Sequence, residues 1–272
     1  EYYNTKYIKM YLVGNRQHRQ WVIEAAKKQG LMPTTEGGLD FKLNMTQLLD
    51  GYPGHEHALP IYPIYNDVVN TIAFTKMACT PTLLVSYGGP WAENYYYATE
   101  NVINDKKLAF FTPKEELDTK ARRRASWFVP EEHIFKRHAE FSKNLLRAGG
   151  LTGIGSHGQL QGLGYHWELW SVQSGGMNNH EALKISSIIG ARALGLDKEL
   201  GSLEPGKLAD LIILDKNPLE NIKNTNTISF VMKNGRMYNG NTLDQVYPQS
   251  IKMPDLEVEY SSPGAVPGIT GK

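Results

Sequence analysis

Strand-like and helix-like segments alternate five times within the first 200 residues of the chain. The strand-like segments are short runs rich in apolar, aromatic or threonine residues, and they cover residues 7–13, 31–36, 55–59, 79–87 and 151–157. The helix-like segments cover residues 17–29, 44–50, 66–77, 131–148 and 179–196. Because strands that are separated by helices form parallel sheets with helical crossovers, this alternation predicts an α/β fold.

The number of these units limits the architecture. A complete (β/α)8 barrel takes about 250 residues and eight strands. Only five strand-like units precede Gly201, so either a smaller open sheet or part of a barrel satisfies the count. The first strand begins abruptly at residue 7, which favours a partial barrel.

After residue 200 the sequence changes character. Residues 201–218 read GSLEPGKLADLIILDKNP, in which Glu204-Pro205-Gly206 suits a tight turn because proline presets φ and glycine tolerates positive φ. The apolar run at residues 208–214 then predicts one buried strand.

Two more strand-like runs, at residues 228–233 and 236–238, follow this segment. Asn234-Gly235 separates them and predicts a tight hairpin. We therefore expect three parts along the chain: a barrel portion at 1–200, a closing β-strand unit at 201–247 and an extended tail at 248–272.

The charge balance and the cysteine count exclude several classes of protein. The 272 residues include 29 basic and 28 acidic side chains, so no net field favours nucleic acid or an anionic membrane. The one basic run, at residues 120–124, favours a solvated surface over a polyanion site. A single cysteine, Cys79, excludes an internal disulfide and a cysteine-rich zinc module. No apolar run approaches the roughly 20 residues that a membrane helix needs.

His55 and His57 lie two residues apart on the third predicted strand. Residues at this spacing point to the same face of a strand, so both imidazoles could reach one metal ion. The alternative for either residue is a hydrogen-bonded histidine of the core.

Three further residues that could bind a metal or take part in catalysis lie within or at the ends of predicted strands. Lys9 occupies the middle of the first strand, where it either serves a functional site or faces solvent on an edge strand. Glu36 ends the second strand and could coordinate zinc or manganese, or orient another ligand. His157 ends the fifth strand among small residues, and a neutral imidazole could bind a metal or act as a base.

The segment after the fifth strand is rich in glycine and aromatic residues. His166 and Glu168 lie here, just beyond the carboxyl end of a predicted barrel strand, where active sites of barrels gather. Both are therefore expected to bind substrate. The alternative is that Trp167 and Trp170 anchor the next helix in the core.

Four segments together resemble the metal-dependent amidohydrolase superfamily: TEGG, GHEHALP, GSHGQLQGLGYHWELW and LEPGKLADLIILDKNPLENI. The resemblance is to its imidazolonepropionase-like members, in the branch fused to TolB-like β-propellers, and it extends from Lys9 to about Val246. It implies the C-terminal portion of a TIM (β/α)8 barrel, strands 4 to 8, followed by a small β-sandwich-type unit.

The resemblance also implies a ligand set. It places Lys9, Glu36, His57 and His157 at one or two divalent ions, with zinc expected, and it favours His57 over His55. Glu36 stands where the family usually has histidine, and His157 where it usually has the aspartate that accepts a proton from the attacking water. His157 is accordingly the expected catalytic base. The family's first-strand histidine pair has no counterpart here, so two ligands would lie on an absent part of the protein.

By resemblance, the expected function is hydrolysis of an amide or cyclic amide C–N bond in a small-molecule substrate by a metal-activated water. The alternatives are a non-catalytic amidohydrolase-like binding or scaffold domain, and an unrelated parallel α/β protein. No nucleic acid and no membrane span are expected. The expected partner is the missing N-terminal half of the same protein or a second copy of the chain.

Overall fold

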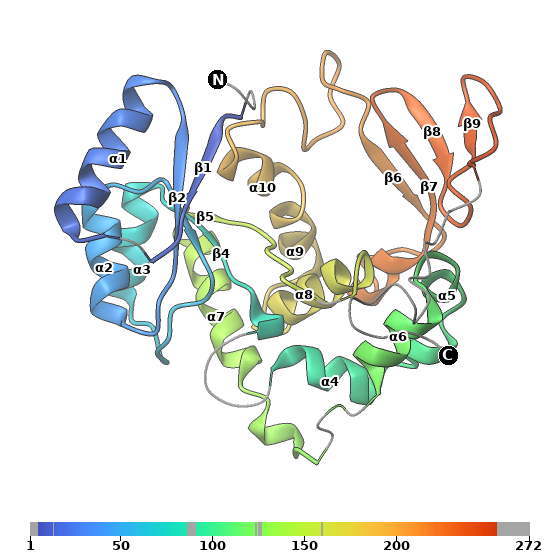
Figure 1. Ribbon diagram of the computed structural model, residues 1–272, viewed down its shortest axis with the longest axis horizontal. Helices are drawn as coiled ribbons and strands as arrows, with labels where there is room; N and C mark the ends of the chain where they lie inside the picture. Colours follow the sequence, from blue (N-terminus) through green and yellow to red (C-terminus); the bar gives the residue numbers. More distant parts are fainter. Residues whose placement is uncertain are drawn as a thin grey trace, which may run out of the picture.

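A parallel five-stranded sheet forms the first part of the computed structural model, which describes residues 5–12, 14–85, 91–122, 124, 127–158 and 160–254 (Figure 1). The strands lie in chain order, β1-β2-β3-β4-β5, and every neighbouring pair is parallel. Their bounds are Tyr7–Met10, Met32–Glu36, Gly54–Glu56, Ala78–Thr80 and Leu151–Thr152. The predicted α/β fold with a parallel sheet is thereby confirmed.

The sheet is compatible with part of a barrel. Consecutive parallel strands in chain order are the arrangement found in (β/α)8 barrels. Among the described residues the sheet does not close on itself, because β1 and β5 remain its two edges.

All five strands are shorter than the sequence predicts, and β1 ends at Met10. β3 ends before His57, whose φ of 73° leaves the extended region. After β4 the chain turns into a short 3-10 helix, η1 (Leu83–Val85), and residues 86–90 of the predicted strand lie outside the described residues. β5 keeps two residues, after which the glycine-rich stretch leaves the sheet.

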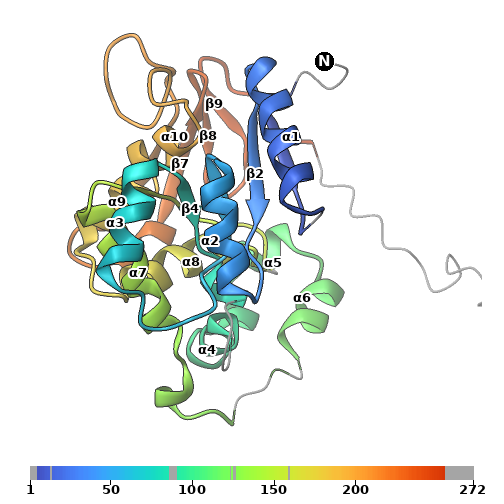
Figure 2. The ribbon, with the colours of Figure 1, turned by 90° about the vertical axis from the view of Figure 1, so that its left-hand side faces the viewer.

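Helices cover one side of this sheet. α1 (Arg16–Lys28), α2 (Phe41–Asp50) and α3 (Asn66–Thr75) lie together on that side, as Figures 1 and 2 show. Local signals set their ends: the Asn15 side chain accepts from the His18 N–H before α1, and Gly51 ends α2 at a φ of 92°. α7 (Phe135–Arg147) packs against α3 and β5.

The two faces of the sheet differ in character. Residues in register on neighbouring strands share a face. One face includes Thr35, His55, Cys79 and Thr152, whose exposed fractions are 3% or less, and at its β1 edge the half-buried Met10. The other face carries the polar residues Lys9, Thr34, Glu36, Glu56 and Thr80, most of them half-exposed.

The segment between β4 and α7 forms short helices. They are α4 (Ala92–Thr99), η2 (Val102–Asn104), α5 (Lys106–Phe111), α6 (Lys114–Ala121) and η3 (Pro130–Glu132). Aromatic residues of α4 enter the main core, where the Tyr96 ring stacks on Trp167 with centroids 5.3 Å apart. Trp167 and Trp170 are 0% and 4% exposed, as expected of core anchors, whereas Trp127 is largely exposed.

The single helix predicted at residues 179–196 is wrong. The structure has α8 (Leu163–Gln173), then two short helices, α9 (Asn179–Ile185) and α10 (Ile188–Ala193). Ser187 separates α9 from α10 because its φ of −134° and ψ of −102° are not helical. In the part of the chain described, no helix combines the length and apolar character that crossing a membrane requires.

The C-terminal part forms a four-stranded antiparallel sheet. Its strands β6 (Leu211–Leu214), β7 (Ile228–Lys233), β8 (Arg236–Asn239) and β9 (Gln245–Tyr247) lie in chain order. The hairpin between β7 and β8 is confirmed, and Asn234 and Gly235 both have positive φ, as the turn requires. Within the described residues this unit is one sheet rather than the expected sandwich.

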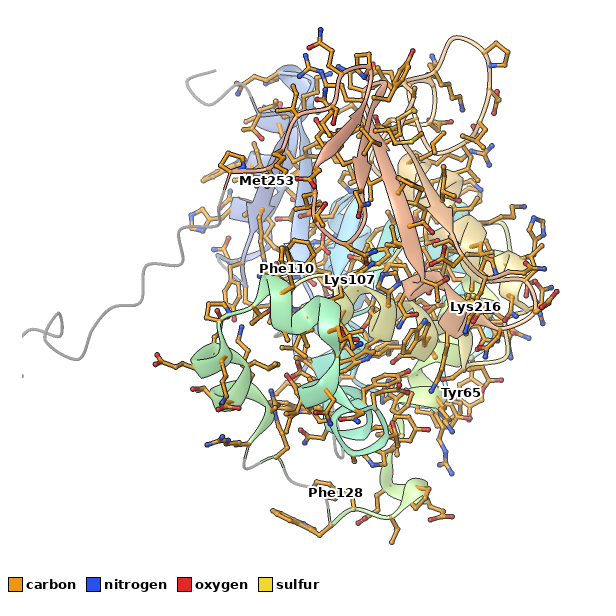
Figure 3. The ribbon with its side chains drawn as sticks, turned by 90° about the vertical axis from the view of Figure 1, so that its right-hand side faces the viewer. Tyr65, Lys107, Phe110, Phe128, Lys216 and Met253 are labelled. Carbon is orange, nitrogen blue, oxygen red and sulfur yellow. The ribbon has the colours of Figure 1, made fainter. Side chains whose placement is uncertain are left out.

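β6 is not the buried strand that its apolar sequence predicts. It is an edge strand, and Ile212 and Ile213 are 50% and 41% exposed. The sheet meets the helices through η4 (Ile222–Asn226), which contacts α8, and through Lys107, whose Nζ donates to the Ile228 carbonyl over 2.8 Å (Figure 3). Residues 255–272 of the predicted tail lie outside the described residues.

Candidate active site

Lys9, Glu36 and His57 meet at the carboxyl ends of three neighbouring strands. Glu36 ends β2, and its Oε1 lies 2.5 Å from His57 Nε2. Its other oxygen, Oε2, lies 2.5 Å from Lys9 Nζ. The Glu36 side chain is 8% exposed and the Lys9 side chain 58% exposed, so the carboxylate is buried while the lysine stem reaches it from a solvent-facing position.

Two more residues extend this group across the sheet edge. The hydroxyl of Thr82, which follows β4, contacts His57 Nδ1, and the His57 N–H donates to the Thr80 carbonyl over 3.0 Å. The His157 ring, after β5, has its centroid 5.3 Å from that of His57. Lys9, Glu36, His57, Thr82 and His157, hereafter the carboxyl-end cluster, thus come from five successive strands or strand ends.

Backbone conformation marks the two histidines as unusual. His57 has a φ of 73° and His157 a φ of 42°, both in the left-handed region that side chains with a Cβ seldom occupy. Residues held in this region cluster at functional sites, where the surrounding structure stabilises them. Here the conformation ends β3 and turns the His57 ring towards Glu36 and Thr82.

Glu36 remains anionic at neutral pH. Burial by itself would raise the pKa of its carboxyl, but the ammonium of Lys9 and the imidazole of His57 outweigh burial and hold the pKa below its ordinary value. Glu36 therefore acts as an acceptor for hydrogen bonds or as a ligand for a cation.

Thr82 and Glu56 are two residues of this region that the sequence did not single out. Glu56 stands beside Glu36 in register on the same face, and its Oε2 accepts from the Thr80 hydroxyl. Thr82 lies just beyond β4, which ends at Thr80, whereas the sequence placed it inside a longer fourth strand. Threonine is common in such positions, so the residue type alone did not distinguish it.

His55 lies outside the carboxyl-end cluster. It belongs to the helix-covered face and is 1% exposed, and burial lowers its pKa to about 4, which keeps the imidazole neutral. Gly37 packs directly against it: a Cβ there would lie 2.6 Å from His55 Cε1. Among the described residues, His55 Nε2 has no hydrogen-bond partner.

In α8, His166 is half-buried and Glu168 fully buried, a setting that differs from the substrate-binding role that the sequence suggested. His166 Nδ1 lies 3.2 Å from the Thr225 hydroxyl, and burial lowers its pKa to about 4 with help from nearby Lys107. The Glu168 carboxyl is fully buried and accepts the backbone N–H groups of Leu83 and Leu84. Each contact joins α8 to another element of the core.

Two donor atoms of the carboxyl-end cluster are of types that divalent metal ions bind. A carboxylate oxygen of Glu36 and an imidazole nitrogen of His57 converge, and both are ligands that zinc accepts. No group of three histidine, cysteine, aspartate or glutamate side chains within the described ranges is placed to hold an ion. Two converging donors are fewer than the three or four protein ligands that zinc sites use.

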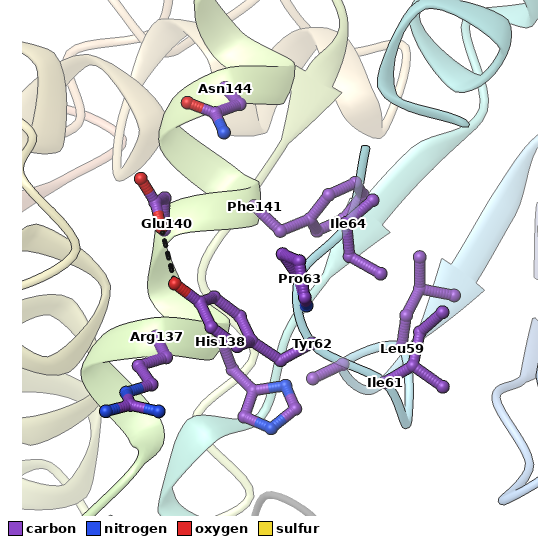
Figure 4. A pocket seen from close by; sticks show the side chains of 11 residues that line it. Leu59, Ile61, Tyr62, Pro63, Ile64, Arg137, His138, Glu140, Phe141 and Asn144 are labelled. Atoms are coloured by element: carbon purple, nitrogen blue, oxygen red, sulfur yellow. Dashed lines mark hydrogen bonds between the residues drawn. The ribbon is translucent and has the colours of Figure 1, made fainter. Parts of the chain in front are cut away.

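A separate shallow pocket lies between α7 and the segment from Ala58 to Ile64 (Figure 4). There Tyr62 Oη donates to Glu140 Oε2 over 3.2 Å, and the Arg137 guanidinium lies 5.7 Å from the Tyr62 ring centre. No member of the carboxyl-end cluster lines this pocket.

The basic run at residues 120–124 is largely neutralised. Lys120 pairs with Glu116, Arg122 with Asp118, and Arg124 with Glu93. Arg122 lies on the surface, whereas Arg124 is 19% exposed and its partner Glu93 is buried, so only part of the run has the solvated setting favoured by the sequence.

Known proteins match parts of this chain in sequence. Residues 157–238 match the amidohydrolase family. The chain is 40% identical over 62 residues to 5-methylthioadenosine/S-adenosylhomocysteine deaminase of Teredinibacter turnerae, which covers 23% of the chain and 14% of that protein. It is 30% identical over 116 residues to guanine deaminase of Escherichia coli, covering 39% of the chain and 26% of that protein. The chain thus spans a minor part of both relatives.

Solved structures share the fold over most of the chain. A Xaa-Pro dipeptidase matches with a TM-score of 0.60 and 19% identity, covering 87% of this chain and 55% of its own. Molinate hydrolase matches with a TM-score of 0.61 and 17% identity, covering 89% and 53%. An adenosine deaminase of Xanthomonas campestris with bound zinc matches with a TM-score of 0.54 and 14% identity, covering 86% and 52%. The family match is limited to residues 157–238, and the solved structures, all below 25% identity, show that the fold is shared.

Proposed function

We propose that the protein containing this chain hydrolyses a C–N bond of a small amide or cyclic amide with the help of a divalent metal, zinc being the expected ion. The observation that carries the proposal is the convergence of Lys9, Glu36 and His57 at the carboxyl ends of neighbouring parallel strands. Active sites of (β/α)8 enzymes gather at that end. Relatives named as deaminases, which also act on C–N bonds, support the reaction class.

Glu36 and His57 would hold the metal, and His157 would stand beside them. Such an ion lowers the pKa of a bound water to about 7 and polarises a carbonyl group. Lys9 holds the Glu36 carboxylate through Oε2, which leaves Oε1 directed towards His57.

Thr82 allows His57 to play either of two parts. When its hydroxyl donates to Nδ1, the imidazole carries its proton on Nε2 and can donate to Glu36. When the hydroxyl accepts from Nδ1–H, the proton is on Nδ1 and the Nε2 lone pair can bind a cation. His157, which is exposed on the segment that follows β5, would accept a proton from the attacking water and return it to the leaving nitrogen.

We infer that further ligands come from the rest of the same protein, as an imidazolonepropionase-like member of the branch with a TolB-like propeller would provide. The likeness to imidazolonepropionase is supported by a 34-residue stretch that is 62% identical to that protein of Picrophilus torridus. A mass of the intact gene product near that of the chain alone would contradict the inference that further ligands come from the rest of the protein.

A substrate screen on the full-length protein tests the proposed reaction. Amides, lactams, cyclic ureas and amino-substituted purines are supplied singly, and release of ammonia or amine is followed. We expect turnover of at least one class. Failure of the metal-supplied, folded protein on every class would instead favour a non-catalytic binding or scaffold domain, for which the mutual pairing of Lys9, Glu36 and His57 would suffice.

A further inference from the structure

We propose that Glu168 is a positioning residue for His57 and that it acts through the backbone of the turn that carries Thr82. This inference rests on the proposed function insofar as it assigns a consequence for catalysis. Its structural content, a connection from Glu168 to the His57 ring, can be tested without any substrate.

The Glu168 carboxyl is committed to two backbone groups. Its Oε1 accepts the N–H of Leu83 over 2.7 Å, and its Oε2 accepts the N–H of Leu84 over 3.0 Å. All three residues are 0% exposed. Glu168 lies in α8, 85 and 84 residues along the chain from its two partners, so the contact joins two elements that the sequence does not bring together.

The first of these hydrogen bonds fixes the residue that holds His57. The Leu83 N–H belongs to the same planar peptide unit as the Thr82 carbonyl, so holding one orients the other. That carbonyl accepts the Val85 N–H over 3.0 Å and so closes the turn. Thr82 is 6% exposed, and its hydroxyl contacts His57 Nδ1. A displaced turn would therefore withdraw the hydroxyl from the ring.

A carboxyl group suits this position better than an amide. Two N–H donors point at the two Glu168 oxygens, so the site needs an acceptor on each side. Glutamine has the same shape, but its NH₂ group would face one of the two N–H donors. A buried backbone N–H left without an acceptor displaces its segment or weakens it.

The test compares Glu168→Gln, Thr82→Val and the double variant in the full-length protein. The first measurement is the nitrogen-15 chemical shift of His57 Nδ1 in histidine-labelled protein, assigned by loss of the signal in His57→Asn. We expect Glu168→Gln to move this signal in the same direction as Thr82→Val. Thr82→Ser keeps the hydroxyl and should leave the signal at the wild-type position. We also expect kcat/KM to fall about 10-fold in Glu168→Gln.

The double variant separates positioning from general support of the core. If Glu168 acts through Thr82, the double variant has the His57 signal and the kcat/KM of Thr82→Val alone. Effects that simply add would overturn the inference. So would an unchanged His57 signal in a folded Glu168→Gln protein.

Asp50→Asn is the matched control. Asp50 is also a buried carboxylate, but it binds Arg16 and Arg19 over 2.7 Å each at the end of α2 and does not touch the Thr82 turn. This variant should lower the melting temperature and leave the His57 signal in place. If the wild-type protein turns over no substrate, the proposed function fails, while the His57 signal still decides the role of Glu168.

Discussion

Replacing His57 with alanine is expected to lower kcat/KM of the full-length protein at least about 100-fold. The reason is that His57 is the centre of the carboxyl-end cluster: Nε2 faces Glu36 and Nδ1 faces Thr82. Alanine removes both contacts and one of the two converging donors for a metal. Initial rates on the substrate found by screening, with metal in excess, give the ratio directly.

Two control variants test whether the loss of activity comes from the His57 ring and not from a disturbed backbone. His57 has a positive φ, which alanine tolerates poorly and asparagine better, so His57→Asn removes the ring with less backbone strain. Activity lost in both variants reports on the ring. His180→Ala, at an exposed position of α9, should retain wild-type activity. A folded His57→Asn protein with wild-type kcat/KM would contradict the assignment of the site.

Replacing Glu36 with glutamine is also expected to lower kcat/KM at least about 100-fold. Glutamine keeps the shape but loses the charge, and its NH₂ group would face either Lys9 Nζ or His57 Nε2. Lys9 is more than half exposed and can be solvated by water, so the protein should still fold. Wild-type activity in this variant would show that Glu36 does not serve the reaction.

The same variant has a signature in the pH dependence of stability. The pKa of Glu36 in the folded protein lies below its ordinary value of 4.5, so its carboxylate contributes stability above that pH. This contribution is lost as the pH falls through the folded pKa. The free energy of unfolding of metal-free wild type should therefore exceed that of metal-free Glu36→Gln at pH 7, and the difference should shrink below pH 4.5. A difference that is constant with pH would contradict the ion pair.

Local sequence patterns predicted most of the fold. The five parallel strands and the β7–β8 hairpin follow from apolar runs, turn residues and spacing, which act over a few neighbouring residues. Two features of the fold depend on packing between segments that are distant in the sequence. They are the break between α9 and α10 at Ser187 and the exposure of Ile212 and Ile213 on β6. Hydrophobic pattern alone contains no such information.

The candidate site divides in the same way. Lys9, Glu36, His57 and His157 could be named because they lie within or at the ends of strands whose carboxyl ends meet at one edge of a parallel sheet. Thr82 required the observed contact with the His57 ring. Glu168 was expected at the substrate, yet it binds two backbone amides more than 80 residues away, a pairing that only the folded chain reveals.

Metal dependence of C–N hydrolysis tests the central claim most directly. The full-length protein is assayed as purified, after removal of metal with a chelator and dialysis, and after return of zinc or manganese. We expect release of ammonia or amine to disappear with the metal and to return with it in wild type, but not to return in His57→Ala. Full activity in protein shown by elemental analysis to contain no divalent metal would contradict the claim.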